Sequence, residues 1–543
     1  MRSLIKSLNS SFISYLVSFF SGVLMGITTA PISAWFLAWF ALAPLWVLIA
    51  DKSRKEKGKK SFSLLPFSFY LLPFFWAIGY HGTALSWITG LHPLTWMGVP
   101  WLGSIGIALF AWVFVTLWGA ILVIIWAFLM NLLVASAPGL IRVIIGTALW
   151  CGLEGLWSCG PLWWTSISYT QSPYNLAILH ISQLSGPSTI TAAIVAVNGL
   201  LAEGFLNRQE AKDAKETKKI TLAPLVSWRF NYFSIAAVLL IFLHLIGFNL
   251  YNSPLTQPAN TALKIGLIQG NVPTRIKLFQ EGIQSALLGY TNGYLDLADR
   301  GVDAVLTPEG ALPFWQDNIL QSSVVDAIKQ KGVPAWIGGF YWQNNRITNS
   351  LFGFNEKGEI ISRYGKVKMV PLGEYIPFQE ILGGIIGRLS PQRGSQSPGN
   401  PNQLIDTPFG RAIVGICYES AFSDIFRHQA AAGGQFILTA SNNDPYNAAM
   451  QFQHHAQDTM RAIETDRWAV RATNTGLSAF VNPHGKTLWI SGHKTYEVHA
   501  ETIYKRNTQT LYVLWGDWLT PSLLGIGGFC LIYIFLNLLK IDN

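Results

Sequence analysis

Charged side chains are scarce in this chain of 543 residues. Aspartate, glutamate, lysine and arginine make up 12% of it, about half of the ~25% that is usual in soluble proteins. Hydrophobic residues make up 50% and aromatic residues 13%. This composition excludes an intrinsically disordered chain and an ordinary cytosolic enzyme, and it favours a membrane protein with many spans. The chain is also longer than one hydrophobic core usually organises, so we expect more than one domain.

Cysteine is equally rare. The four cysteines are Cys151, Cys159, Cys417 and Cys530. No C-x-x-C motif and no cysteine–histidine spacing typical of a zinc site occurs among them. His454 and His455 are adjacent, so on a helix they point about 100° apart, and no third ligand is evident. We therefore expect no disulfide framework, no metal and no cofactor.

Eight apolar stretches are long enough, or nearly so, to cross a bilayer core of ~30 Å as helices. They lie near residues 11–29, 32–50, 64–80, 104–132, 139–157, 187–205, 232–250 and 522–539. The first stretch resembles a signal peptide, but Pro31 directly follows the candidate cleavage site and a second apolar run begins at once. We therefore expect an uncleaved first span.

The lysines and arginines outside residues 251–521 occur in every second connection between these stretches. They lie in the N-terminus, in residues 51–60, 133–142 and 206–231, and in the C-terminal tail, whereas residues 30–31, 81–103 and 158–186 have none. Basic residues accumulate on the cytoplasmic side of a membrane, so both termini are expected in the cytoplasm. The net charge of +9 is then mainly a topology signal, and nucleic-acid binding is not expected. The segment 206–221 is expected to be a solvated charged loop.

The same alternation places residues 251–521 on the outer side of the membrane. This segment is nearly neutral, with 22 basic and 21 acidic residues, and it alternates strand-like with helix-like patterns, which is typical of a layered α/β domain. The expected strands are Leu263–Gln269, Asp303–Thr307, Ala335–Phe340, Ala412–Cys417, Phe436–Ala440 and Leu477–Asn482, and the expected helices lie near 279–298, 318–331 and 447–467. Residues 387–403 are expected to form a surface loop.

These patterns divide the chain into three parts. Residues 1–250 form a seven-span membrane domain, residues 251–515 an extracytoplasmic domain, and residues 516–543 an eighth span with a cytoplasmic tail.

Three segments of the outer domain place a reactive side chain at a strand end or a turn. Glu309 follows a strand-like run, Lys366 lies eight residues before Glu374 in a segment rich in proline and glycine, and Cys417 ends an apolar strand. Each also has an ordinary explanation: a solvated turn carboxylate, a surface lysine and a small core residue. A lysine beside a carboxylate can, however, stabilise an oxyanion. A cysteine at a strand-to-loop corner can act as a nucleophile and use the next backbone N–H as an oxyanion donor.

The motifs around these residues occur together in an order that resembles a known family. They are QGNVP (269–273), TPEGALP (307–313), YGKVKMVPLGEYIP (364–377), GICYES (415–420) and SNNDPY (441–446). With the apolar segments before and after them, they resemble the apolipoprotein N-acyltransferases, the membrane-bound branch of the nitrilase superfamily. The resemblance covers essentially the whole chain. It implies eight spans and an extracytoplasmic α/β domain of the nitrilase-like αββα sandwich type.

The resemblance also implies an activity. A fatty acyl chain moves from a membrane phospholipid, through a thioester on Cys417, to the N-terminal amino group of the diacylglyceryl-cysteine of an apolipoprotein. Glu309 acts as the base, and Lys366 stabilises the oxyanion together with the backbone N–H of Tyr418. The enzyme is expected in a bacterial inner membrane with its catalytic domain in the periplasm.

The supporting residues and partners follow from the same resemblance. Glu374 and Glu419 are expected to orient Lys366 and keep it protonated. Lys368 is a second lysine in this motif, and Lys366 is favoured as the inward-facing one by its position. The partners are a phospholipid acyl donor and a diacylated lipoprotein acceptor, and nothing in the sequence suggests more than a monomer.

Two other functions remain open from the sequence. A membrane-tethered amidase of the nitrilase type would use the same triad but pass its acyl group to water. A transporter or lipid-binding protein would carry the outer domain as an inert attachment. The role of Glu154 in the fifth span also stays open, and Trp87, Trp96 and Trp101 are expected to be interfacial anchors.

Overall fold

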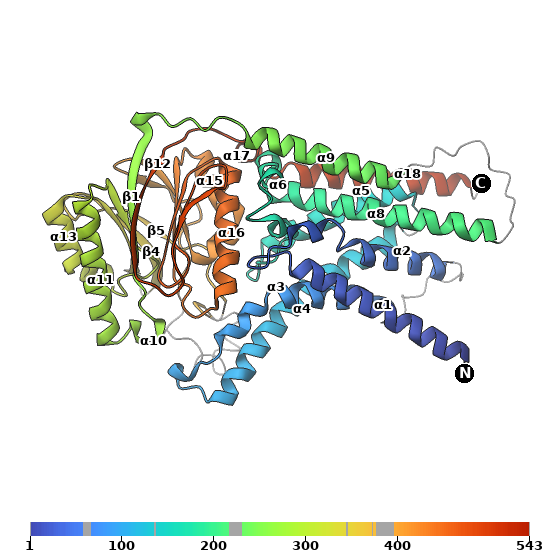
Figure 1. Ribbon diagram of the computed structural model, residues 1–543, viewed down its shortest axis with the longest axis horizontal. Coiled ribbons are helices and arrows are strands. Elements are labelled where there is room, and N and C mark those ends of the chain that lie inside the picture. The colour runs from blue at the N-terminus through green and yellow to red at the C-terminus, as the bar shows by residue number, and fades with distance from the viewer. Residues whose placement is uncertain are drawn as a thin grey trace.

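The computed structural model describes residues 2–57, 67–134, 137–216, 231–343, 346–371, 373–375 and 396–541. The N-terminal half and the last helix form a bundle, and the intervening segment forms an α/β domain at one end of it (Figure 1). Both chain termini lie at the end of the bundle that is farther from the α/β domain.

Seven of the eight predicted spans fall mainly on one long helix each, whereas the second, 32–50, is divided between the 3₁₀ helix η1 (Trp35–Trp39) and α2 (Ala43–Lys57). The long helices of the bundle are α1 (Arg2–Gly26), α2 (Ala43–Lys57), α3 (Phe67–Ala84), α4 (Trp101–Val134), α5 (Gly139–Ser158), α8 (Pro187–Glu216), α9 (Tyr232–Tyr251) and α18 (Leu519–Ile541). Within the described ranges, six stretches are long and apolar enough to cross a membrane: Trp35–Ser53, Trp101–Val134, Gly139–Ser158, Pro187–Gln209, Tyr232–Tyr251 and Leu519–Leu536. Ser11–Gly26 is a shorter apolar helix.

One predicted loop is helical in the structure. Helix α8 continues to Glu216, so the expectation of a loop over 206–221 is wrong for its first eleven residues, and residues 217–221 lie outside the described part. The segment 209–216 consists of glutamine, glutamate, alanine, lysine and aspartate. Most of these are good helix formers, so a helix that leaves the apolar bundle can continue into water.

Glu154 has a structural role in the bundle. Its carboxylate accepts hydrogen bonds from Trp150 Nε1 (3.2 Å), Ser166 Oγ (2.9 Å), the backbone N–H of Ile167 (2.9 Å) and Thr191 Oγ1 (2.8 Å). These donors belong to α5, to the connection after it and to α8. The buried carboxylate is thereby satisfied and ties two helices to the loop between them.

The α/β domain contains two six-stranded sheets, in the orders β12-β1-β2-β3-β4-β5 and β11-β10-β9-β8-β7-β6. The strands are β1 (Ala262–Gln269), β2 (Ala304–Leu306), β3 (Ala335–Gln343), β4 (Arg346–Phe354), β5 (Ile360–Gly365), β6 (Ile405–Thr407), β7 (Gly410–Ile416), β8 (Phe436–Ser441), β9 (Ala469–Thr473), β10 (Ala479–Val481), β11 (Thr487–Ile490) and β12 (Glu497–Tyr504). Strands β1, β2 and β3 are parallel, as are β7, β8 and β9, and the outer pairs are antiparallel.

The sheets are stacked with helices on their outer faces. Side chains of both sheets, such as Leu267 and Val414, share one buried core. Helices α11 (Gln280–Asp299) and α13 (Ser323–Lys331) pack on the first sheet, and α15 (Ser423–Ala431) and α16 (Ala448–Thr465) on the second. This is the αββα arrangement that the sequence predicts.

The predicted strands correspond to β1, β2, β3, β7, β8 and β10, and six others were missed. Strand β9 shows why. Arg471 interrupts its apolar pattern, yet this arginine is buried and paired with Asp458 of α16. The pairing makes burial of the charge possible, and a local pattern cannot reveal it. Of the predicted loop 387–403, residues 387–395 lie outside the described part.

Helix α16 joins the two halves of the molecule. It lies between the second sheet and the bundle (Figure 1), and its Met460 and Ile463 belong to the core of the bundle. Its Gln453 donates from Nε2 to the carbonyl oxygens of Ala30 (3.0 Å) and Ala84 (2.8 Å) and accepts from Trp164 Nε1 (2.8 Å). The buried helix α16 therefore links the α/β domain to the bundle.

Candidate active site

Four polar residues of the site follow strand ends directly or closely. Cys417 follows β7, Asn442 follows β8, Lys366 follows β5, and Glu309 comes three residues after β2. In layered α/β domains, sites gather beyond strand ends because the backbone leaves the sheet there and frees side chains to converge.

Cys417 lies at a sharp turn. It is the first residue of the short 3₁₀ helix η6 (Cys417–Ala421), and its φ is +53°. This left-handed conformation costs a residue with a side chain ~1–2 kcal/mol, so the surrounding contacts must hold it. Cys417 is buried, with 5% of its surface exposed.

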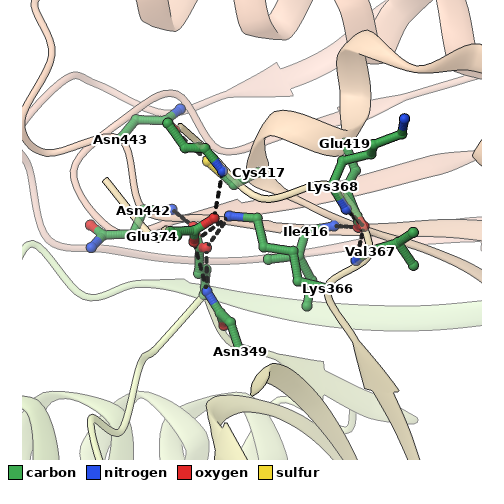
Figure 2. Close-up of polar contacts among 12 residues, drawn as sticks. Asn349, Lys366, Val367, Lys368, Glu374, Ile416, Cys417, Glu419, Asn442 and Asn443 are labelled. Atoms are coloured by element: carbon green, nitrogen blue, oxygen red, sulfur yellow. Dashed lines mark hydrogen bonds and ion pairs between the residues drawn. The ribbon is translucent and has the colours of Figure 1, made fainter. Parts of the chain in front are cut away.

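Lys366 lies between two carboxylates. Its Nζ is 2.8 Å from Glu309 Oε1 and 2.7 Å from Glu374 Oε1 (Figure 2). All three side chains are buried or nearly so. One ammonium thus faces two carboxylates, and the two carboxylates hold it in place by charge-assisted hydrogen bonds.

Two asparagines orient the carboxylate of Glu309. Asn349 Nδ2 on β4 donates to Glu309 Oε1 over 2.6 Å, and the backbone N–H of Asn442 donates to Oε2 over 2.7 Å. Both oxygens are therefore held in place. Sequence reasoning assigned no role to either asparagine: Asn442 lies in a motif noted above, but no local signal marks Asn349.

The charges of this cluster set the protonation of the lysine and the thiol. Burial lowers the pKa of Lys366, but Glu309 and Glu374 raise it more, so that the pKa lies well above its usual range. Burial raises the pKa of the Cys417 thiol and Glu309 raises it further, while Lys366 opposes them. The lysine is therefore charged and the cysteine is a thiol at neutral pH, so attack by sulfur requires a base.

Glu419 contacts the backbone of the lysine segment. Its carboxylate accepts hydrogen bonds from the backbone N–H groups of Val367, Lys368 (3.1 Å) and Ile416 (2.7 Å) (Figure 2). It also accepts one from the Tyr364 hydroxyl (3.1 Å). Burial raises its pKa to about 7, although these backbone hydrogen bonds lower it. Glu419 thus joins the lysine loop to the end of β7 through the backbone, whereas Glu374 contacts the Lys366 ammonium directly.

Lys368 does not join the carboxylate cluster. Its Nζ lies 4.7 Å from the centre of the Phe422 ring. Of the two lysines in the motif, the structure places Lys366 beside Glu309, in agreement with the position favoured from the sequence.

The side chain of Tyr418 points into the membrane-domain connection. Its hydroxyl donates to the carbonyl oxygens of Pro161 (2.8 Å) and Trp163 (2.9 Å), and its ring stacks on Trp164 with centroids 6.1 Å apart. The residue after Cys417 therefore anchors this turn to the bundle.

Trp87 is not an interfacial anchor, and that expectation is wrong for this residue. It is 8% exposed and packs against Trp164 and Tyr446, with centroids 5.3 and 5.1 Å away. Trp96 and Trp101 are exposed. The difference is tertiary: the α/β domain covers Trp87, which a one-dimensional pattern cannot show.

Lys277 is a further buried cation that the sequence reasoning missed. It ends α10 (Thr274–Lys277), and its Nζ donates to the backbone carbonyl of Glu309 over 3.3 Å. Burial lowers its pKa to about 8, although Glu309 and Asp444 raise it. Lys277 therefore supports the turn that presents Glu309. A lysine in the short apolar run that follows the QGNVP motif is the only local sign of this role.

Replacing Lys277 with methionine is expected to change how stability depends on pH. Between about pH 8 and about pH 10.5 the folded lysine is neutral while the unfolded one is protonated, so the free energy of unfolding rises with pH in this window. Over this window the free energy of unfolding of the parent should rise by up to about 3 kcal/mol more than that of Lys277→Met. Thermal unfolding in detergent at pH 8 and pH 10 measures it. Lys357→Met, at an exposed position, is the control, and a difference between parent and Lys277→Met that is constant with pH would contradict the prediction.

Known proteins are similar in sequence to this chain over nearly its full length. It is 57% identical over 502 residues to an apolipoprotein N-acyltransferase of Nostoc sp., which covers 92% of this chain and 96% of the relative. An apolipoprotein N-acyltransferase of Synechocystis sp. is 44% identical over 519 residues, which is 94% of this chain and 98% of the relative. The chain belongs to the apolipoprotein N-acyltransferase family. This confirms the family that the motifs indicate.

Family matches to parts of the chain agree with this assignment. The apolipoprotein N-acyltransferase N-terminal domain matches residues 21–200, and the carbon-nitrogen hydrolase family matches residues 264–510. Among solved structures, an amidase of the nitrilase superfamily from Nesterenkonia is similar, with 16% identity, a TM-score of 0.36 and coverage of 48% of this chain and 95% of that one. The NitFhit protein of C. elegans has 15% identity and a TM-score of 0.37, over 46% of this chain and 62% of that one.

Proposed function

We propose that this chain transfers a fatty acyl group from a membrane phospholipid to the N-terminal amino group of the diacylglyceryl-cysteine of apolipoproteins, with Cys417, Glu309 and Lys366 as catalytic residues. The observation that carries the proposal is the buried Glu309–Lys366–Glu374 cluster beside a thiol in a left-handed turn. It supplies a base, a fixed cation and a nucleophile in one place.

The first half-reaction forms a thioester. Glu309 takes the proton of the Cys417 thiol, and the sulfur attacks the acyl ester carbonyl of the phospholipid. Lys366 and the backbone N–H of Tyr418 stabilise the tetrahedral oxyanion; one such donor is typically worth ~3–4 kcal/mol of barrier. The ester C–O bond then breaks, and Glu309 returns its proton to the departing alkoxide. A lysophospholipid leaves and the acyl group stays on sulfur.

The second half-reaction consumes the thioester. The α-amino group of the lipoprotein has an ordinary pKa of about 7.7–8.0, so a usable fraction is neutral at pH 7. Its nitrogen attacks the thioester carbonyl, and Glu309 takes the proton from nitrogen. The C–S bond then breaks, and Glu309 gives this proton to the leaving sulfur, which restores the Cys417 thiol and the carboxylate. The amide product is more stable than the thioester, so transfer runs forward without ATP. Glu374 keeps Lys366 charged, and Glu419 holds the lysine loop against the nucleophile turn.

An apolar cluster beside the reactive turn suits lipid substrates. Buried aromatic side chains from the membrane domain and from the α/β domain meet there, among them Trp87, Trp164, Tyr418 and Phe422. Exposing an acyl chain to water costs ~0.8 kcal/mol per CH₂. A site seated on the bundle avoids this cost because the acyl carbonyl has only a short way to rise from the bilayer.

We further propose eight membrane spans, cytoplasmic termini and a periplasmic catalytic domain in a bacterial inner membrane. The division is 1–250, 251–515 and 516–543, and the enzyme acts as a monomer. The alternation of basic residues supports this topology. The position of both termini at the end of the bundle away from the α/β domain agrees with it (Figure 1).

Transfer and hydrolysis are distinguished by the acceptor. Purified enzyme in detergent is incubated with a diacyl phospholipid and a synthetic peptide that begins with diacylglyceryl-cysteine. We expect mass spectrometry to detect N-acylated peptide and lysophospholipid in equal amounts. The same peptide with an acetylated N-terminus is the control and should give no product. Release of free fatty acid at the same rate with and without peptide would instead support the amidase.

A further inference from the structure

The backbone of Cys417 is held by helix α16. His454 of this helix is fully buried, and its Nε2 lies 2.7 Å from the carbonyl oxygen of Cys417. Its Nδ1 lies 3.0 Å from Asn443 Nδ2. The Cys417 thiol in turn donates to Asn443 Oδ1 over 3.5 Å. Three residues thus close a ring of hydrogen bonds around the nucleophile.

Gln451 determines the direction of these hydrogen bonds. Asn443 Nδ2 donates to Gln451 Oε1 over 2.8 Å, and Gln451 Nε2 donates to the carbonyl oxygen of Asn443 over 2.9 Å. The amide nitrogen of Asn443 can only donate, so His454 Nδ1 is the acceptor and the ring proton lies on Nε2. Burial, and then Arg471, lower the pKa of His454 to about 3. The imidazole is therefore neutral and donates to the carbonyl of Cys417.

The hydrogen bond from His454 to the Cys417 carbonyl also affects the next N–H group of the chain, that of Tyr418. In a trans peptide the C=O and the following N–H point in opposite directions within one plane, and the bond between Cys417 and Tyr418 is not among the cis bonds of the described residues. By holding the carbonyl of Cys417, His454 also sets the direction of the Tyr418 N–H. It supports the left-handed conformation of Cys417 at the same time.

We infer that His454 is a positioning residue for acylation of Cys417: its imidazole, oriented by Asn443, turns the Cys417–Tyr418 peptide so that the Tyr418 N–H meets the developing oxyanion. The inference rests on the proposed role of Cys417 as nucleophile. His455 is a matched control, because it is the next residue on the same helix and is also buried, but its Nε2 contacts Thr487 Oγ1 instead (3.0 Å).

The test compares two reactions of the same sulfur. Acylation by p-nitrophenyl butyrate passes through an oxyanion: a C–S bond forms, the ester C–O bond breaks and p-nitrophenolate leaves. Alkylation by iodoacetamide displaces iodide from a saturated carbon and forms no oxyanion. We expect His454→Leu to lower kcat for the burst of p-nitrophenolate about 10²-fold with little change in KM, and to leave the alkylation rate near that of the parent.

A conservative variant and a control complete the design. His454→Gln places an amide N–H near the position of the imidazole Nε2, so it should recover most of the lost kcat, and His455→Leu should acylate like the parent. If His454→Leu does not fold, as judged by thermal unfolding, His454→Phe takes its place. Cys417→Ala supplies the background rate.

Two outcomes would overturn the inference. One is an equal loss of acylation and alkylation, and the other is a loss that glutamine does not relieve. The ester probe needs no phospholipid. A parent enzyme that releases p-nitrophenolate through Cys417 but takes no acyl group from phospholipid would contradict the proposed function and leave this inference standing.

Discussion

Cys417→Ala is expected to abolish acyl transfer, with a fall in rate of at least about 10⁴-fold. The sulfur is the only atom of the site that the proposed mechanism bonds to substrate, and alanine at this position cannot replace it. After incubation with phospholipid, intact-mass measurement should show a fatty-acyl adduct on the parent that hydroxylamine removes. The variant should show none.

The fold offers a fair control for this result. Alanine has the same left-handed backbone cost as cysteine, so the turn at Cys417 gains no new strain. Cys530→Ala removes a thiol of the last helix of the bundle, outside the α/β domain, and should retain both adduct and transfer. An acyl adduct that persists in Cys417→Ala, or normal transfer by this variant, would end the thioester mechanism.

Glu309→Gln is expected to slow thioester formation by about 10²–10⁴-fold, the usual contribution of a general base. The Cys417 pKa is raised by burial first and by Glu309 next, so few thiolates exist without proton transfer. Glutamine has the shape of glutamate but cannot take up the proton. Its amide nitrogen also turns one acceptor into a donor that faces Asn349, Lys366 or the N–H of Asn442. Single-turnover acylation with phospholipid measures the effect.

Two measurements separate chemistry from folding in this variant. An unsatisfied buried donor costs about 1–3 kcal/mol, so the unfolding temperature of Glu309→Gln should fall while the protein still folds. Glu356→Gln, at an exposed position between β4 and β5, should match the parent in both measurements. Acylation of Glu309→Gln at the parental rate would show that another group removes the proton.

Local sequence patterns predicted the structure correctly where a requirement on neighbouring residues determines it. A helix that crosses a bilayer needs a continuous apolar run, so seven of the eight predicted spans fall mainly on one long helix each. Strands β1, β3, β7 and β8 are buried runs whose neighbours are also apolar. Glu309 and Cys417 each follow an apolar run, and their motifs and that of Lys366 occur in the order that is typical of the family. The fold class and the proposed triad could therefore be predicted.

Other assignments failed where a distant partner changes what a residue can do. Arg471 is buried because Asp458 pairs with it, and Trp87 is buried because Tyr446 and Trp164 cover it. Glu419 accepts hydrogen bonds from the backbone N–H groups of Val367 and Lys368, about 50 residues earlier in the chain, and from that of Ile416. Apart from Ile416, which is three residues from Glu419, these partners are distant in sequence, so no periodicity or spacing predicts them.

The sequence by itself determined the apolar helices, the layered α/β domain and the positions of the three proposed catalytic side chains, because apolar runs and local motifs act over a few residues. Only the tertiary structure decided how those side chains are charged and aimed. The lysine is held between two carboxylates, and Asn349, Lys277 and His454 approach the glutamate and the cysteine from three separate elements. Hydrogen bonds and buried charges depend on distances of about 3 Å between such elements, and only folding brings these groups that close.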